Sequence, residues 1–184
     1  TFLSNIGSIY YEWGQYDKAI ENFQQALTIH RRLGKEDGVA ASLQNIGGVY
    51  SAWGQYDKAI ENYQQALVIN RKLGKEDGIA TSLSNIGGVY RSLGQYDKAI
   101  ENFQQALTIA RRLKIGGRIA VYLNNIGGVY KAWGQYDKAI ENFQRALTLF
   151  RKLGTEDKIA LSLNNIGTVY QAWGQYDKAI ENFQ

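Results

Sequence analysis

The stretch Gly-Gln-Tyr-Asp-Lys-Ala-Ile-Glu-Asn at Gly54–Asn62 decides the fold, because it recurs unchanged along the chain. Identical copies begin at Gly14, Gly94, Gly134 and Gly174, so the sequence repeats every 40 residues without an insertion. A fixed period of a few tens of residues is typical of stacked supersecondary units rather than of one globular core. We therefore predict a single solenoid over residues 1–184, as part of a longer array, with units at 1–40, 41–80, 81–120, 121–160 and 161–184, the last of them truncated.

Each unit contains two helical patterns. In the first, an apolar residue recurs at spacings of four, three, four and three, which lays one apolar stripe along a helix of about four turns. We name this element helix A. In the unit around Gly54 its stripe consists of Val39, Leu43, Ile46, Tyr50 and Trp53.

The second pattern, helix B, follows a turn at Gly54, a residue that readily takes the positive φ found at many helix C-termini. Its apolar positions again have helical spacing: Tyr56, Ala59, Ile60, Tyr63, Ala66, Leu67 and Leu73. Arg71 and Lys72 fall in the last turn, where cations interact favourably with the helix dipole, and Gly74 ends the helix. Because the turns are short, we expect successive helices to be antiparallel.

Acidic pairs stand before the next helix A, at 36–37, 76–77 and 156–157. A carboxylate pair can bind a cation or carry out acid–base chemistry. Asp is also a common N-cap, because its side chain accepts a hydrogen bond from a free backbone N–H of the first turn. Since the pairs recur with the period, we favour capping and predict that Asp37, Asp77 and Asp157 are N-caps.

The helix pairs expose apolar side chains on more than one face and cannot bury them alone, so we expect neighbouring units to stack into a continuous core. Small residues mark the expected close contacts between helix axes: Gly47 in helix A, and Ala59 and Ala66 in helix B. A larger side chain at Gly47 is therefore predicted to overpack its contact.

Four tryptophans recur at one place in the period, at Trp13, Trp53, Trp133 and Trp173, with Leu93 at the fifth. They are consistent either with an aromatic recognition ladder or with packing in the core or the turns. We favour packing, because large aromatic side chains usually fill such positions.

The residues Leu43, Ile46, Gly47, Tyr50, Ala59, Tyr63 and Ala66 resemble the tetratricopeptide signature in order and spacing. The unit is longer than the usual one of about 34 residues, and in this it is similar to the arrays of kinesin light chain and of Pins-type polarity scaffolds. The resemblance implies an all-α, right-handed superhelical solenoid of antiparallel helix pairs, with about four and a half repeats. It also implies a protein-interaction scaffold whose concave groove, lined by helix A, binds an extended peptide or a partner protein.

The other face of helix A, away from the apolar stripe, is polar and nearly uncharged in every unit. An asparagine amide offers two donors and one acceptor, which match the N–H and C=O groups of an extended peptide main chain, and glycines one turn further on leave room for that backbone. Alternatively, these amides bond only across neighbouring repeats. The predicted groove residues are Asn5, Gln44, Asn45, Gly48, Asn85, Gly88, Arg91, Asn124, Asn125, Gly128, Lys131, Asn164 and Asn165.

The formal net charge of +4 is concentrated in residues 81–160. Arg91 and Lys131 stand at the end of the polar face in two consecutive units, and Lys-Ile-Gly-Gly-Arg at 114–118 replaces the acidic turn of the other units. We therefore expect a mildly acidic peptide across these two units. A solvated charged edge without a ligand is the alternative, since exposed charges usually contribute little.

The residue inventory argues against catalysis. The chain has no cysteine, and its single histidine, His30, is replaced by Asn70, Ala110 and Phe150 in the other units. Two-histidine metal sites and cysteine nucleophiles are thereby excluded. We predict that the protein is not an enzyme and uses neither a metal nor another cofactor.

Other functions compete with peptide binding less strongly. End-to-end association of the solenoid with its own copies is the main alternative, because the predicted units at the two ends carry no polar capping helix. RNA binding fits the basic middle of the chain, but the uniform asparagines would read few bases. No stretch is apolar enough to span a membrane and no secretory signal opens the chain, so we expect no membrane contact and a cytoplasmic location.

Overall fold

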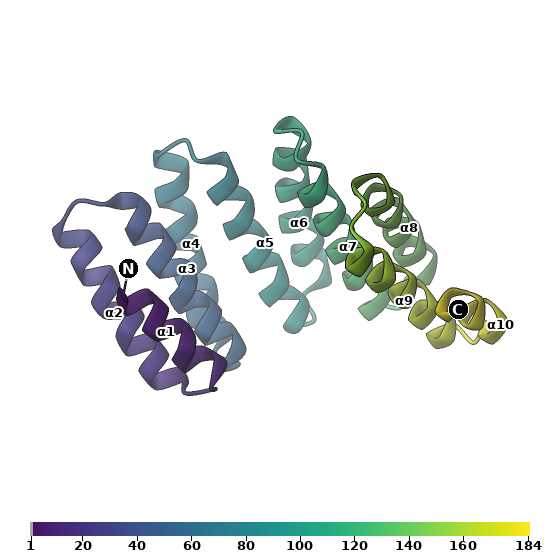
Figure 1. Ribbon diagram of the computed structural model, residues 1–184, viewed down its shortest axis with the longest axis horizontal. Helices are drawn as coiled ribbons and strands as arrows, with labels where there is room; N and C mark the ends of the chain where they lie inside the picture. Colours follow the sequence, from purple (N-terminus) through teal and green to yellow (C-terminus); the bar gives the residue numbers. More distant parts are fainter. Residues whose placement is uncertain (1) are drawn as a thin grey trace. The chain divides into compact units, whose positions relative to one another are not determined.

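The computed structural model describes residues 2–184, and within them it contains ten helices and no strand. Their bounds are α1 Phe2–Glu12, α2 Tyr16–Arg32, α3 Glu36–Ala52, α4 Tyr56–Lys72, α5 Glu76–Ser92, α6 Tyr96–Arg112, α7 Gly116–Ala132, α8 Tyr136–Leu153, α9 Glu156–Ala172 and α10 Tyr176–Phe183. The helices follow one another along the chain (Figure 1), and contacts join α1 to α2, α2 to α3, α3 to α4, and each helix from α6 to α10 to the next. The odd-numbered helices are the predicted helices A and the even-numbered ones the helices B.

The turns between the helices form as the glycine pattern predicts. Gly54 has a φ of 76°, and its N–H donates to the carbonyl of Ser51 at 3.1 Å, while the N–H of Gln55 donates to the carbonyl of Tyr50 at 2.8 Å. These bonds satisfy carbonyl groups that the end of a helix leaves free. Lys114 takes this conformation at one turn, with a φ of 56°, in the segment whose sequence departs from the repeat.

The prediction that the aspartates are N-caps is wrong. Helix α3 begins at Glu36, so Asp37 lies inside its first turn, and the N-cap is Lys35, which makes no side-chain capping bond. Asp77 and Asp157 likewise lie within the first turns of α5 and α9. Their carboxylates therefore stabilise the helix starts through the helix dipole rather than by capping.

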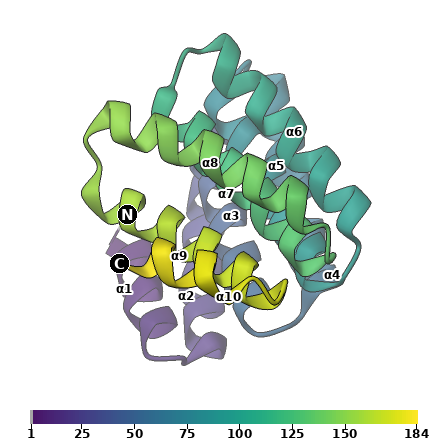
Figure 2. The same ribbon diagram turned by 90° about the vertical axis from the view of Figure 1, so that its right-hand side faces the viewer.

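The chain divides into two compact units, Thr1–Val89 and Tyr90–Gln184, which we call unit 1 and unit 2. In unit 1 the predicted stripes of α2 and α3 meet in a core that includes Phe23, Leu43 and Ile46. In unit 2 the helices from α6 to α10 pack each against the next (Figure 2). Their core includes Phe143 and Ile166, so the helical periodicity of the sequence identifies the buried faces in both units.

Glycines set the distance between helix A and helix B. A methyl group placed on Gly47 would lie 2.8 Å from ring carbons of Tyr63, which is closer than side-chain carbons normally approach. The same contact joins Gly127 to Phe143, where the distance would be 2.9 Å. The aromatic ring of helix B thus occupies the space that a side chain on helix A would need, as predicted for Gly47.

The tryptophans lie in turns rather than in the core. Trp53 packs on Tyr16 of the preceding repeat with 6.0 Å between ring centroids, and Trp133 packs on Tyr96 at 5.8 Å. Trp53 keeps 39% of its surface exposed, so it covers the repeat junction without being enclosed by it. The sequence was consistent with tryptophan packing in the core or in the turns, and the structure shows it in the turns.

Substituting neighbouring glycines tests this packing. We expect Gly47→Ala to lower the free energy of unfolding by about 1–2 kcal/mol, because its methyl group overlaps the ring of Tyr63. We expect Gly48→Ala to raise it by about 0.5–1 kcal/mol, since that methyl group would lie 3.7 Å from the nearest atom and alanine favours a helix. Urea unfolding of both variants measures the effects; equal effects would contradict the assigned helix contact.

Candidate binding face

The predicted groove residues lie on the solvent-facing side of the helices A, which we call the amide face. In unit 1 they are Asn5 on α1, Gln44, Asn45 and Gly48 on α3, and Asn85 and Gly88 on α5. In unit 2 they are Arg91 at the end of α5, Asn124, Asn125, Gly128 and Lys131 on α7, and Asn164 and Asn165 on α9. They are exposed or half-buried because the stripe of the same helix turns its apolar residues into the core.

A hollow of about 470 Å³ opens on the amide face of unit 1. It brings together four of the predicted residues, Gln44, Asn45, Gly48 and Asn85, whereas Asn5 and Gly88 do not line it. The remaining lining residues are Ser8, Tyr11 and Glu12 of α1, Phe23 of α2, Val49 of α3 and Tyr63 of α4. Side chains from α1, α3, α4 and α5 therefore converge on one site.

Tyr63 forms part of this hollow, which the sequence analysis did not anticipate. Its ring covers Gly47, and its hydroxyl lies 3.7 Å from the point where a side chain on Gly48 would begin. Burial raises the pKa of Tyr63 to about 12, with the nearby Tyr11 as a smaller cause, so the phenol keeps its proton above pH 10, where an exposed tyrosine loses it. The signal in the sequence is a departure from the repeat, since the equivalent residues are Phe23, Phe103, Phe143 and Phe183.

Tyr11 and Glu12 form the edge of the hollow at the end of α1 and were also missed as a site. Among the described residues that line the hollow, Glu12 alone is charged. Its signal, too, is a departure from the repeat, because the equivalent positions hold Ala52, Ser92, Ala132 and Ala172.

Most asparagine side chains of the amide face have no hydrogen-bond partner in the described part of the chain. Within residues 2–184 the side chains of Asn5, Asn45, Asn85 and Asn125 make no hydrogen bond. The alternative of bonding across repeats holds elsewhere. Asn165 donates through Nδ2 to Oδ1 of Asn124 at 3.1 Å, and Gln44 donates through Nε2 to the hydroxyl of Ser82 at 3.1 Å.

The amide face of unit 2 carries two cations. Nη1 of Arg91 lies 3.1 Å from the position that a Cβ on Gly128 would take, so the guanidinium covers that glycine. Lys131 donates from Nζ to the hydroxyl of Thr168 at 2.8 Å, and partial burial lowers its pKa. No carboxylate of the described residues forms an ion pair with either cation.

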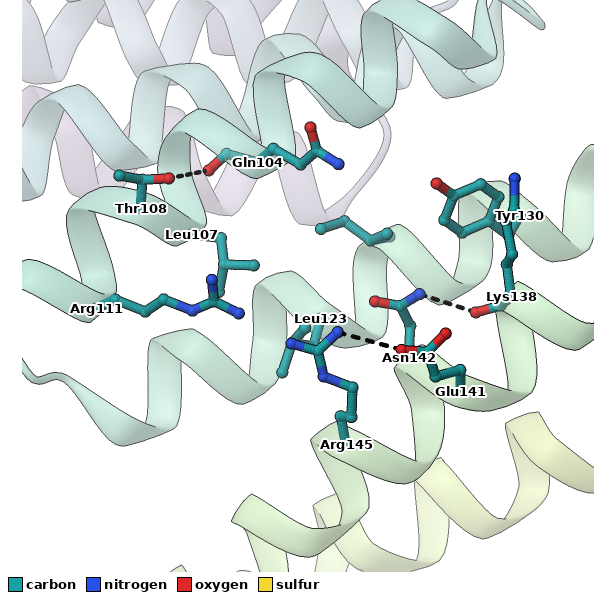
Figure 3. Close-up of a pocket in the computed structure, with 11 residues that line it drawn as sticks. Gln104, Leu107, Thr108, Arg111, Leu123, Tyr130, Lys138, Glu141, Asn142 and Arg145 are labelled. Carbon is teal, nitrogen blue, oxygen red and sulfur yellow. Dashed lines mark hydrogen bonds and ion pairs between the residues drawn. The ribbon is translucent and has the colours of Figure 1, made fainter.

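A second hollow of about 470 Å³ lies in unit 2 among α6, α7 and α8, away from all predicted groove residues. Figure 3 shows its polar side chains, several of which interact with one another. Arg145 pairs with Glu141 at 3.5 Å, and Asn142 donates to the backbone carbonyl of Lys138 at 2.8 Å. Several polar and charged groups of this hollow therefore already have partners within the chain.

Neither metal ligands nor membrane spans emerge from the described part of the chain. No group of three or more His, Asp or Glu side chains is placed to hold a metal ion there. None of its helices is both long and apolar enough to cross a bilayer.

The sequence that forms these helix pairs matches a known family. The model of the tetratricopeptide repeat matches the chain at residues 1–72, 54–112, 78–152 and 117–184. The chain belongs to the tetratricopeptide repeat family. This confirms the resemblance that the signature residues indicated, together with the all-helical solenoid fold that it implied.

Several solved tetratricopeptide structures resemble this one over almost its whole length. BtubC (BKLC) from P. vanneervenii has a TM-score of 0.86 and 27% identity, covering 98% of this chain and 75% of its own. A putative kinesin light chain of nearly identical repeats from Podospora anserina has a TM-score of 0.81 and 23% identity, covering 98% and 89%. A Rap protein complexed with competence and sporulation factor has a TM-score of 0.84 and 23% identity, covering 98% of this chain and 51% of its own. No curated protein sequence matches the chain.

The raised pKa of Tyr63 predicts a pH-dependent stability. The phenol has an ordinary pKa of 10.0 in the unfolded chain and about 12 in the fold, so its contribution is fully present below pH 10 and lost as the pH rises toward 12. Across this window we expect the free energy of unfolding to fall relative to Tyr63→Phe by about 1.4 kcal/mol per pH unit. Urea unfolding of both proteins from pH 9 to 12 measures this; a constant difference would refute the buried phenol.

Proposed function

We propose that the chain is a protein-interaction module that binds an extended peptide, or an extended segment of a partner protein, along its amide face, and that it is not an enzyme. The amide face corresponds to the concave groove that the family resemblance implies. The observation that carries the proposal is the unit 1 hollow, which Asn45, Gly48 and Asn85 line, and where both asparagine amides are without a hydrogen bond to the described residues.

The chemistry of these amides suits a peptide main chain. Each amide can donate to a carbonyl and accept from an N–H of an extended strand, whatever the side chains of that strand are. Gly48 adds no side chain beyond its backbone, so a main chain can approach helix α3 closely. Tetratricopeptide folds generally mediate protein–protein contacts, and the similar Rap protein is in complex with competence and sporulation factor.

Unit 2 favours an acidic ligand. It contains thirteen basic and eight acidic residues, whereas unit 1 contains eight and nine. Arg91 and Lys131 stand on its amide face without a carboxylate partner in the described chain. A carboxylate of a bound peptide would interact with both cations. For Lys131 it would also offset the hydration that the ammonium group loses through partial burial.

Self-association is a second candidate, supported by apolar exposure on the first and last helices. Ile180 of α10 is 55% exposed, whereas the equivalent Ile100 and Ile140 are buried. On α1, Ile9 is 48% exposed, whereas the equivalent Val49 is buried. A second copy of this chain or further repeats would cover these faces, and light scattering over a range of concentrations detects association between copies as a rising mass.

Selection from a random library of linear peptides displayed on phage tests the main proposal. We expect the wild-type chain to select peptides, and Asn45→Ala with Asn85→Ala to weaken their binding at least tenfold, because the amide bonds to the main chain are lost. Asn62→Ala is the matched control, since that asparagine is on helix B and bonds the carbonyl of Lys58. Unchanged binding by the double variant, with its helical spectrum intact, would reject the amide face as the binding site.

Charge reversal tests the acidic ligand separately. For selected peptides that contain Asp or Glu, we expect Arg91→Glu with Lys131→Glu to lower affinity at least tenfold at low salt and less at high salt. Lys152→Glu with Lys158→Glu makes the same change in net charge at exposed sites away from the amide face. Equal losses in both pairs would show that only net charge matters.

A further inference from the structure

The unit 1 hollow differs chemically from the rest of the amide face. Its lining has one carboxylate, that of Glu12, and no basic side chain, whereas the amide face of unit 2 has Arg91 and Lys131. It also has two phenols, Tyr11 and Tyr63, close enough together for one to influence the pKa of the other.

The residues that make this difference are those that depart from the repeat. Where the hollow has Tyr11, the other units have Ser51, Arg91, Lys131 and Gln171. Glu12 replaces alanine or serine, and Tyr63 replaces phenylalanine. Tyr11 and Glu12 come from α1 and Tyr63 from α4, yet all three line the same hollow. Two departures from the copied sequence, Glu12 and Tyr63, therefore line the same hollow as Tyr11, whose position holds a different residue in every unit.

The position of Glu12 is unfavourable without a ligand. It is the last residue of α1, where the negative end of the helix dipole disfavours a carboxylate. No basic side chain of the described residues forms an ion pair with it, and the nearby Lys18 lies instead over the ring of Tyr10 at 5.3 Å. A cation bound in the hollow would interact favourably with both the carboxylate and the helix end.

The other lining groups complete the environment of a long cationic side chain. The amide oxygens of Gln44, Asn45 and Asn85 and the phenol oxygens are hydrogen-bond acceptors, which ammonium and guanidinium groups require because they only donate. Tyrosine rings attract cations over their faces. Phe23 and Val49, which are buried, form the apolar base of the hollow beneath these polar groups.

We propose that the hollow is a specificity subsite that binds a lysine or arginine side chain of the peptide. The carboxylate of Glu12 neutralises the bound cation, the phenol hydroxyls of Tyr11 and Tyr63 hydrogen-bond it, the exposed ring of Tyr11 borders it, and the amides of α3 and α5 hold the adjacent main chain. This subsite rests on the proposed function, because it selects one side chain of a peptide that the amide face binds.

The repeats themselves supply variants that should preserve the fold. Glu12→Ala and Tyr63→Phe each install the residue that other units have at the same position. The experiment compares peptides selected from a random phage library by the wild-type chain and by Glu12→Ala. We expect lysine or arginine to be enriched at one fixed position with the wild type, and this enrichment to disappear with the variant. Glu61→Ala, an exposed carboxylate on helix B, is the matched control and should select as the wild type does.

A second measurement tests directly whether Glu12 interacts with the cation of the peptide. For one selected peptide, replacing its conserved cation by norleucine should lower the affinity of the wild-type chain at least tenfold but leave that of Glu12→Ala nearly unchanged. Tyr63→Phe should lower the affinity of the cationic peptide by a smaller factor. If Asn45 and Asn85 are needed for binding but no cation is enriched, the subsite is refuted and the proposed function stands. If the wild type selects no peptide, both are refuted.

Discussion

The structure depends on the close approach of helix A to helix B at one glycine in each of α1, α3, α7 and α9. At Gly47 and Gly127 an aromatic ring of helix B fills the space next to the backbone, so no side chain fits there. This contact fixes the rotation of helix A about its own axis. Because the glycine side faces helix B, the opposite side, with Asn45 and Asn125, must face solvent. The buried ring and the exposed amide ladder are therefore two consequences of one packing constraint.

Periodicity was sufficient to predict this framework, because a helix or turn that is predicted in one unit of an exact repeat is predicted in every unit. The helix pairs, the turn at Gly54 and the buried stripes follow from spacing alone. The N-caps did not follow, because whether Asp37 lies at or inside the helix start depends on the backbone of Lys35, which spacing does not specify. The contribution of Tyr63 to the hollow could not be predicted either. It depends on where its hydroxyl lies relative to Gly47 and Gly48 of another helix, which spacing does not specify.

Variation inside the core has a different meaning from variation on the surface. At one interior position of helix B, His30 bonds Ser42 at 3.0 Å and Asn70 contacts Ser82 at 3.5 Å. In the fourth repeat the equivalent residue is Phe150, which cannot hydrogen-bond, and the buried hydroxyl of Ser162 has no partner within the described chain. These exchanges alter packing and polar satisfaction at a junction between repeats, and they present nothing to a ligand.

An array of nearly identical repeats presents a nearly uniform surface, and a uniform surface can hold a main chain but cannot choose among side chains. Selectivity must therefore come from exposed departures from the repeat. In unit 1 the exposed Tyr11 and Glu12 lie at one hollow that the buried Tyr63 also lines, and in unit 2 Arg91 lies beside Gly128 with Lys131 on the same amide face. Salt screens exposed charges beyond about 8 Å, so each group acts on the ligand atoms it contacts. In the function that we propose, the asparagines of the amide face provide affinity for a peptide main chain, and these few substitutions determine which side chains are preferred.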